Sequence, residues 1–270
     1  METYIVDSFT TEPFKGNPAG VCFPQQEIGA EAMLKIAQEF GLSETAFVRE
    51  TSAAGVYAIR YFSPKQEIPL CGHATLAAAK VLFSQTLHTE IHFLTHEQVD
   101  LPISRRADDI TMTFPVYDTV PVAAPPALLA ALGLPAVTNT AYSPKNKIVL
   151  LEIADDQQLA ALRPDFAALL QSHTGINGVL VTAPGRTPAY DYDYHYRYFW
   201  PWAGTNEDPV TGGVQTFLAK YWATRLHKSV MQAFQSSART GAMQVELHAD
   251  KVLLTSQARI VLEGRLVAFA

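Results

Sequence analysis

Two stretches of this chain repeat each other, and the repeat constrains the fold more than any other feature. Residues 60–64 read RYFSP and residues 197–201 read RYFWP, an offset of 197 − 60 = 137 positions. Residues 69–73 read PLCGH and residues 209–213 read PVTGG, an offset of 209 − 69 = 140. The repeats of solenoid proteins run to about 20–50 residues, so a period of half the chain predicts two similar halves instead. Ligand sites are common between such units, which makes a cleft between the halves the expected site.

Each half is expected to hold one apolar helix inside a sheet. Residues 72–83 are rich in Ala, Leu and Val, and residues 209–223 are expected to form the second buried helix, with Pro209 suited to a first helical turn. The alternating segments around them are typical of strands. The sequence therefore predicts an α+β fold of two pseudo-symmetric halves, each a strongly curved, mostly antiparallel sheet around a central helix. The halves are expected at 1–118 and 119–270, and the C-terminal end is in a position to return and pack on the first half.

The composition is that of an enzyme-sized globular protein. Its 270 residues suffice for two cores, at about 100–200 residues per domain. A net charge of −6 argues against nucleic-acid binding, which needs a basic surface. The N-terminus shows no signal-peptide pattern, and no apolar run approaches the roughly 20 residues of a membrane span. Two cysteines without a C-x-x-C spacing form no disulfide framework, so a cytoplasmic location is expected.

Glycine and polar residues gather where both predicted helices begin, in residues 71–75 (CGHAT) and 208–213 (DPVTGG). The free N–H groups and the dipole at a helix start favour anions, and glycine lets a carboxylate approach the backbone closely. Taken singly, Thr75 and Asp208 are explained as helix caps and the glycines as turn residues. Because the pattern recurs in both halves, we favour a carboxylate-binding role for the two starts together.

Glu44 lies in the segment LSETAFV, between a predicted helix end and a predicted strand. A carboxylate flanked by apolar residues at such a junction loses part of its hydration, which would raise its pKa toward that of a useful general base. On the residues alone, a solvated glutamate in a turn is the plainer interpretation. The equivalent stretch of the second half, residues 176–181, has no carboxylate, so the pseudo-symmetry is broken here.

Five motifs spread over nearly the whole chain resemble, in the same order, those of the phenazine-biosynthesis-like (PhzF-like) isomerase family. They are residues 14–21 (FKGNPAGV), 43–45 (SET), 71–75 (CGHAT), 207–212 (EDPVTG) and 239–241 (RTG). The resemblance implies the diaminopimelate epimerase fold. It also implies a cofactor-independent isomerase, commonly a homodimer, that moves a proton between carbons of a small carboxylate-bearing substrate.

The same resemblance implies roles for individual residues. Glu44 would be the proton-shuttling acid/base, and His73 and Asp208 would line the cleft and hold or polarise the substrate. The implied substrate-binding residues are Asn17, Cys71, Gly72, Thr211, Gly212 and Gly213. No metal is implied.

The chain departs from its relatives at two positions. Family members often carry a serine where this chain has Gly213, so one cleft hydroxyl is missing and another substrate than the phenazine precursor is expected. Related epimerases use a cysteine at each helix start, whereas Cys71 here has Thr211 as its counterpart. A single carboxylate base therefore fits better than a two-thiol racemisation. An epimerase, or an idle relative that binds a small ligand or a partner, are the alternatives.

Other polar residues have plainer explanations. Asp191, Asp193 and His195 alternate along one segment and would share a strand face, as metal ligands do. We favour instead tyrosines packed on one face and this polar set in solvent. Arg60 and Arg197 could bind carboxylates, but their recurrence within a strand motif favours a structural role.

Overall fold

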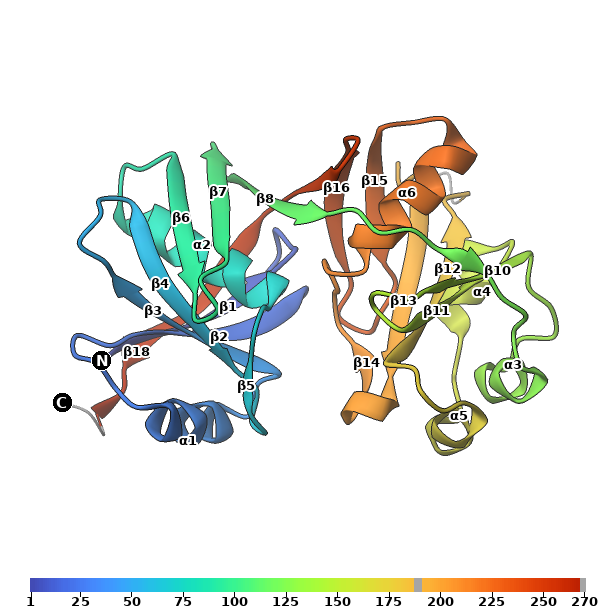
Figure 1. The fold of residues 1–270 in the computed structure, drawn as a ribbon, viewed down its shortest axis with the longest axis horizontal. Coiled ribbons are helices and arrows are strands. Elements are labelled where there is room, and N and C mark those ends of the chain that lie inside the picture. The colour runs from blue at the N-terminus through green and yellow to red at the C-terminus, as the bar shows by residue number, and fades with distance from the viewer. Residues whose placement is uncertain (187–190, 268–270) are drawn as a thin grey trace. The chain divides into compact units, whose positions relative to one another are not determined.

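The computed structural model describes residues 1–186 and 191–267, and the chain divides into two compact units (Figure 1). Unit 1 comprises Met1–Thr113 and Leu253–Ala270, and unit 2 comprises Phe114–Val252. Each unit is built mainly of strands with few helices, which confirms the predicted α+β class. None of the described helices is long and apolar enough to cross a membrane.

Unit 1 contains two helices and nine complete or nearly complete strands. They are β1 (Glu2–Ser8), β2 (Asn17–Phe23), α1 (Ala30–Phe40), β3 (Glu44–Glu50), β4 (Val56–Phe62), β5 (Glu67–Ile68), α2 (Gly72–Gln85), β6 (Glu90–Thr95), β7 (Asp100–Arg106), β8 (Asp109–Pro115) and β18 (Ala258–Arg265).

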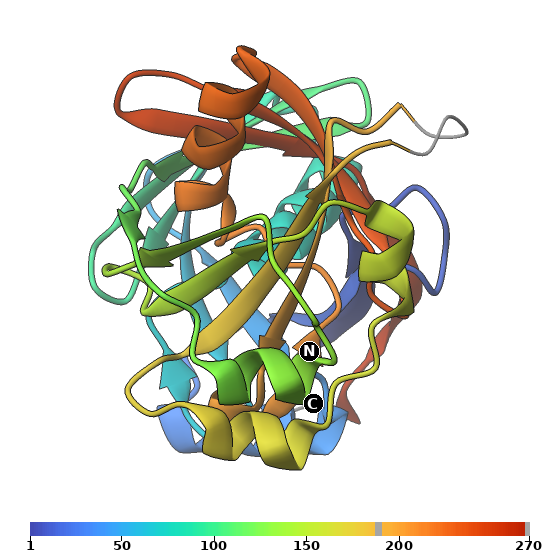
Figure 2. The same ribbon diagram turned by 90° about the vertical axis from the view of Figure 1, so that its right-hand side faces the viewer.

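Unit 2 follows a similar plan with more helices, and Figure 2 shows α3 and α5 together on one side of it. Its elements are β9 (Val120–Pro121), α3 (Pro126–Leu132), β10 (Asn139–Ser143), β11 (Ile148–Glu152), α4 (Asp156–Ala161), α5 (Phe166–Ser172), β12 (Gly178–Pro184), β13 (Tyr194–Trp200), the 3₁₀ turn η1 (Pro201–Ala203), β14 (Thr205–Asp208), α6 (Gln215–Leu226), β15 (Val230–Gln235) and β16 (Gly241–Leu247). Strand β17 (Lys251–Ser256) carries the chain back into unit 1.

The strand order is the same in the two units, as the internal repeat predicts. Unit 1 runs β1-β2-β3-β4-β6-β7, and unit 2 runs β10-β11-β12-β13-β15-β16. Parallel pairs occur at the same steps, β2 with β3 and β4 with β6 in unit 1, and β11 with β12 and β13 with β15 in unit 2. The other pairs along these two series are antiparallel. The shared order shows that the repeat extends beyond the matched sequence motifs to the whole sheet.

A buried helix lies against the sheet in each unit. In α2 nearly every residue from His73 to Phe83 is buried, and in α6 the buried positions include Phe217, Leu218 and Trp222. Small alanines along α2 let the curved sheet approach it from several sides, and α2 contacts β1, β2, β3 and β18. The prediction of one central apolar helix per half is confirmed.

The start of the second helix differs from the prediction. Helix α6 begins at Gln215 instead of Pro209, and the residues between form turns. The first bonds are of the tighter i to i+3 kind: the Gln215 amide donates to the Gly212 carbonyl at 3.0 Å and the Thr216 amide to the Gly213 carbonyl at 3.4 Å. Two consecutive glycines favour helix poorly, which explains why regular α-helix is delayed until after them.

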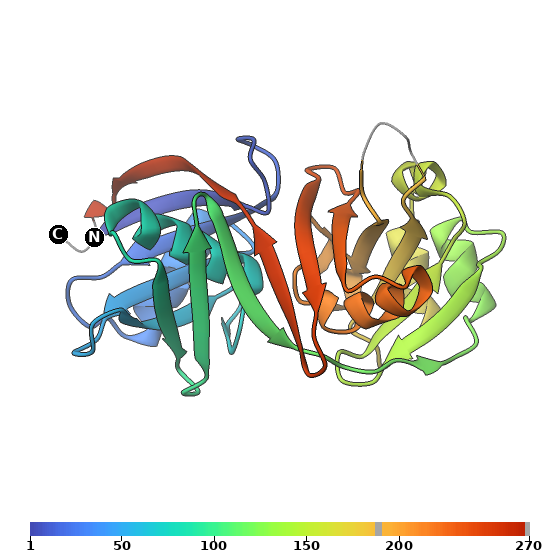
Figure 3. The same cartoon turned by 90° about the horizontal axis from the view of Figure 1, so that it is seen from above.

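The C-terminal strand belongs to the sheet of unit 1. Strand β18 pairs antiparallel with β1, from Glu2 opposite Arg265 to Ser8 opposite Ala258. Figure 3 shows this red strand beside the blue strands of the N-terminal sheet. Strand β1 is therefore paired on both edges, by β18 and by β2.

Candidate acid/base site

Glu44 lies at the junction between a helix and a strand. Helix α1 ends at Gly41, whose left-handed φ of 62° turns the chain toward β3, and Glu44 is the first residue of that strand. It is opposite Ala19 of β2 in a parallel pairing. The residue is only 8% exposed, so the interpretation of Glu44 as a solvated turn glutamate is wrong.

His73, in the first turn of α2, is the centre of the polar cluster in unit 1. Its Nε2 lies 3.2 Å from Glu44 Oε2 and 3.3 Å from Ser43 Oγ. Its Nδ1 lies 3.3 Å from the Asn17 side-chain amide and 3.4 Å from Cys71 Sγ. Four residues named from the sequence thus meet around one imidazole: Asn17, Glu44, Cys71 and His73. Whether they act in catalysis stays a prediction.

The ionisation of this cluster differs from the sequence-based expectation. Burial raises the pKa of Glu44, but the hydrogen bond and charge of His73, with a smaller hydrogen bond from Ser43, outweigh it and leave the pKa lowered. The expected rise is therefore wrong. For His73, burial lowers the pKa, and the interactions with Cys71 and Glu44 raise it well above 6.5. The resting pair near neutral pH is a carboxylate beside an imidazolium.

Cys71 and Glu44 both raise the pKa of His73, Cys71 by more, but only Glu44 is a charged partner near neutral pH. Burial raises the pKa of the Cys71 thiol, with smaller opposing contributions from His73, so near neutral pH this thiol is protonated and carries no charge. The backbone around the pair is also fixed, because Ser8 Oγ donates to the His73 carbonyl at 2.7 Å. The first amides of α2, beginning at Gly72, have no partner within the helix, which suits them to an anion.

Unit 2 holds a second polar cluster, around Asp208 at the end of β14. Asp208 is 7% exposed, and its Oδ2 accepts a short hydrogen bond from Thr211 Oγ1. Gln235 joins the same turn from β15: its Oε1 accepts from the Thr211 amide at 2.7 Å and its Nε2 donates to the Asp208 carbonyl at 2.6 Å. The turn continues into Gly212, which is buried, and Gly213, which is exposed. The sequence-predicted residues of the second helix start are thus adjacent in space.

The positions equivalent to Glu44 and His73 in unit 2 are both glycine. The first residue of β12, Gly178, occupies the place of Glu44, because Ile148 lies opposite Gly178 as Ala19 lies opposite Glu44. His73 maps onto Gly213 by the offset of 140. Of the two units, only unit 1 therefore carries the pair of Glu44 and His73.

Arg60 and Arg197 form matched ion pairs in the two units. Each guanidinium binds one carboxylate through two hydrogen bonds of 2.7 Å, Arg60 to Glu67 and Arg197 to Glu207. Arg197 also donates to backbone carbonyls at the end of α4, including that of Leu162 at 2.9 Å. With these donors engaged, both arginines have the structural role that the repeat favoured.

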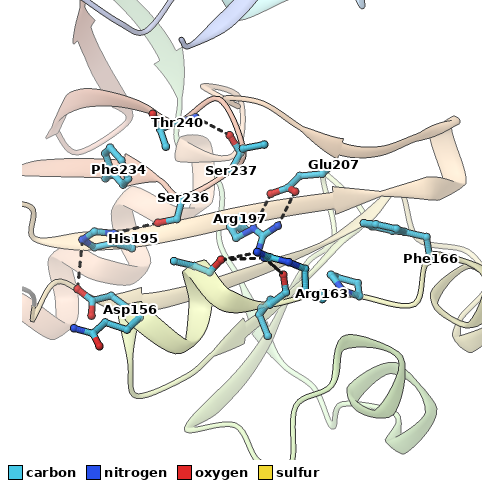
Figure 4. A pocket seen from close by; sticks show the side chains of 15 residues that line it. Asp156, Arg163, Phe166, His195, Arg197, Glu207, Phe234, Ser236, Ser237 and Thr240 are labelled. Carbon is cyan, nitrogen blue, oxygen red and sulfur yellow. Dashed lines mark hydrogen bonds and ion pairs between the residues drawn. The ribbon is translucent and has the colours of Figure 1, made fainter.

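A cavity of 640 Å³ opens on one face of the unit 2 sheet (Figure 4). His195 lies in its wall, with Nδ1 3.2 Å from Ser236 Oγ and Nε2 3.6 Å from Asp156 Oδ2. Tyr194 and Tyr196, which alternate with it along β13, point to the other face, where Tyr194 stacks on Trp222 of α6. The cavity is therefore on the opposite face of the sheet from the central helix.

The contacts of these side chains argue against the hypothesis that Asp191, Asp193 and His195 bind a metal. Asp193 pairs with Lys228 and accepts the Gln232 amide, while Asp191 is exposed. His195 is buried at 6% exposure, so the expectation that the whole polar set meets solvent is wrong. Tyr194 and Tyr196 lie on one face as predicted, whereas Tyr192 packs against His195 and Phe234, and Tyr190 lies outside the described residues. Among the residues described, these three do not form a group of possible metal ligands.

Sequence reasoning missed three residues that hold the clusters in place. Ser43 was noticed only as part of a motif, and its position next to Glu44 was the available signal. Ser8 and Gln235 gave no signal, because strand pairing brings them to the clusters from distant parts of the chain.

Comparison with known proteins supports, first, the fold described above. A solved structure described as a predicted epimerase from Pseudomonas aeruginosa has a TM-score of 0.73 to this chain, covering 98% of it and 99% of that chain. Their sequences are 18% identical, so this likeness concerns the fold alone.

Closer relatives define the family. The family model described as phenazine biosynthesis-like protein matches residues 6–269. An uncharacterised isomerase of Pseudomonas aeruginosa is 39% identical over 268 residues, which cover 98% of each chain. A solved structure of a putative phenazine biosynthesis PhzC/PhzF protein from Clostridium difficile is 37% identical, with a TM-score of 0.88 over 98% of this chain and 99% of that chain. The chain belongs to the phenazine biosynthesis-like protein family.

Proposed function

We propose that this protein is an isomerase that moves a proton between carbon atoms of a small, carboxylate-bearing substrate, with Glu44 as the acid/base. The observation that carries the proposal is the buried contact of 3.2 Å between Glu44 and His73. Family membership and the isomerase description of a relative support the reaction class.

The chemistry follows from the charge state of the pair. Glu44, held as a carboxylate by His73, takes a proton from one substrate carbon and returns it to another on the same face. The imidazolium of His73 stabilises the carboxylate before the transfer and after it. Substrate and product are isomers, so no electrons enter or leave.

The lowered pKa of Glu44 limits which substrates can react. A catalytic base works best when its pKa lies near the operating pH, and lowering the pKa makes a carboxylate a weaker base. We therefore infer that the substrate carries a C–H bond already acidified by conjugation with a carboxylate, as in an unsaturated cyclic acid. Backbone N–H groups at Gly72 would hold that carboxylate.

The unit 2 cluster is proposed to serve the same reaction through binding. Asp208, with Thr211, Gly212 and Gly213, offers a carboxylate, a hydroxyl and helix-start amides to polar substrate groups. An Asp208→Asn variant is expected to change KM more than the Glu44→Gln variant does. Equal KM values in the two variants would argue against this binding role.

A two-base epimerase is the less favoured alternative. Such a reaction needs a second acid/base group, and the unit 2 counterparts of Glu44 and His73 are Gly178 and Gly213. The counterpart of Cys71 is Thr211, whose hydroxyl is engaged with Asp208. These residues favour a proton transfer that begins and ends on Glu44.

Solvent exchange tests the proposal. A panel of cyclic unsaturated carboxylic acids, with the phenazine precursor among them, is incubated with the protein in heavy water and followed by NMR. The substrate is expected to exchange a C–H for deuterium, and Glu44→Gln should slow exchange by about 10²–10⁴-fold. Glu50→Gln is the matched control, because Glu50 is the exposed last residue of the same strand. Exchange that persists unchanged in Glu44→Gln removes Glu44 from the role of base.

The absence of exchange with every acid would favour the alternative of a relative that binds a ligand without turning it over. Direct binding of the same acids, measured by calorimetry, separates the two. The homodimer and the cytoplasmic location stay predictions, and light scattering in solution tests the first.

A further inference from the structure

Three side chains of the types that bind transition metals meet in the core of unit 1. Among the residues described, Glu44, Cys71 and His73 are the group whose ligand atoms all lie within 4.8 Å of one another. Each residue is 8% exposed, so the three donors are shielded from bulk water. The proton transfer proposed for Glu44 and His73 makes no use of the Cys71 thiol.

The spacing of Glu44 and His73 is close to that of two ligands on a tetrahedral zinc ion. His73 Nε2 lies 3.2 Å from Glu44 Oε2 and 3.9 Å from Cys71 Sγ. Zinc bonds of about 2.0–2.1 Å to nitrogen and oxygen and about 2.3 Å to sulfur place N and O about 3.3 Å apart, and N and S about 3.5 Å apart. Sγ lies nearer to the other ring nitrogen, 3.4 Å from Nδ1, so the Cys71 side chain would rotate toward Nε2 to supply the third corner. The fourth corner would be open to water, as in zinc sites with three protein ligands.

The donor types point to the same ion. Thiolate and imidazole together favour zinc or another late divalent metal over calcium or magnesium, which prefer oxygen. The ring nitrogen that would not bind the ion, Nδ1, lies 3.4 Å from Cys71 Sγ and faces the Asn17 side-chain amide at 3.3 Å. Such a partner orients a ligating histidine.

Unit 2 provides an internal comparison. The positions equivalent to Glu44, Cys71 and His73 are Gly178, Thr211 and Gly213, which offer at most one hydroxyl. The donor set is therefore not a general consequence of the repeated fold.

We propose that Glu44, Cys71 and His73 form a binding site for Zn²⁺, and that the bound ion inhibits the protein. On binding, the thiol proton of Cys71 and the Nε2 proton of His73 leave to solvent, and the ion takes their place. Inhibition rests on the proposed function, because the ion would occupy the two atoms that the proton transfer uses. Metal binding itself does not depend on that function.

Cobalt substitution tests the binding directly. Co²⁺ is added to the metal-free protein, and the thiolate-to-cobalt charge-transfer band is recorded, followed by displacement with Zn²⁺ in a calorimeter. We expect the band in the unmodified protein and in Cys22→Ser, the matched control, because Cys22 is the only other cysteine and is buried in β2. The band should vanish in Cys71→Ser. Zn²⁺ affinity there should fall by more than roughly 100-fold, since even partners outside the ligand shell cost about 10–100-fold.

Two further measurements keep the test decisive. Glu44→Gln is a second variant that is also expected to weaken Zn²⁺ binding. It replaces Cys71→Ser in the test if Cys71→Ser does not fold. Inhibition by Zn²⁺ is measured for each active variant against its own metal-free rate, and should weaken in Cys71→Ser as binding does.

The outcomes separate this inference from the proposed function. The absence of a cobalt band, or Zn²⁺ affinity unchanged in both Cys71→Ser and Glu44→Gln, would place any bound ion elsewhere and overturn the site. A cobalt band in a protein that exchanges no substrate proton would support the metal site and reject the proposed isomerase. Binding at Cys71 without loss of turnover would overturn the inhibitory role.

Discussion

The coupling between Glu44 and His73 predicts how the histidine titrates when the carboxylate is removed. In Glu44→Gln, the raising contribution of the carboxylate is lost while the interactions with Cys71 remain, and the pKa of His73 should fall. The facing atoms are 3.2 Å apart, and their delocalised charges about 4 Å, where the attraction is about 4 kcal/mol at an effective dielectric constant of 20. One pKa unit corresponds to about 1.36 kcal/mol, so losing this attraction should lower the pKa of His73 by more than about one unit.

The assay is an NMR titration of the imidazole signals, which needs no substrate. The chain has eight histidines, and His73→Gln identifies the signal of His73 by its loss. Glu50→Gln, at the exposed end of β3, should leave the titration unchanged. If the pKa of His73 does not fall in Glu44→Gln, Glu44 is not a group that charges it, and the resting ion pair is refuted.

The same pair has a defined effect on stability against pH. The lowered pKa of Glu44 contributes stability that is present above about 4.5 and is lost as the pH falls through the folded value. The raised pKa of His73 contributes stability that is fully present below 6.5 and is lost as the pH rises through the folded value. The stability advantage over Glu44→Gln should therefore be largest between pH 4.5 and 6.5, as measured by urea unfolding.

Three other substitutions test the described contacts. Gly213→Ser should change the free energy of unfolding by less than about 0.5 kcal/mol, because a Cβ there meets no atom within 4 Å. The same variant should raise turnover of the phenazine precursor, and no gain would show that the missing hydroxyl is irrelevant. Gly178→Ala should cost about 1–3 kcal/mol in urea unfolding, because its Cβ would lie 2.5 Å from Tyr198 Cε2. Arg197→Met leaves the partly buried Glu207 carboxylate unpaired and should cost up to about 3 kcal/mol, the lower end of the range for a fully buried pair. The loss should exceed that of Arg60→Met, whose ion pair is about a quarter exposed; equal losses would contradict this.

The repeat in the sequence was enough to predict the two units and their central helices. Apolar composition also predicted that α2 and α6 would be buried, since a helix without a polar face has no other stable place. The start of α6 could not be predicted in the same way. Proline suits a first helical turn, but the two glycines and the hydrogen bonds of Gln235 hold residues 209–214 as turns.

The sequence predicted which residues form the site better than it predicted their ionisation. Motifs named Glu44, His73, Cys71 and Asn17, and the structure brings these four together. The direction of the Glu44 pKa was missed because the flanking sequence reports burial and not the partner. His73 follows Glu44 by 29 positions, and only the packing of β3 against α2 brings its charge within 3.2 Å. Long-range strand pairing likewise hid Ser8 and Gln235.

The pairing of β18 with β1 sets an order in which the chain can fold as it is synthesised. Unit 2 is one continuous segment, so all of its strands and helices are available once residue 252 has been made. Unit 1 was begun earlier but its sheet lacks the strand that covers β1 until residues 258–265 emerge. During synthesis, the sheet of unit 1, with Glu44 and His73, therefore keeps an open edge until β18 is added. Chaperones that shield exposed strand edges would act on the unit that was made first.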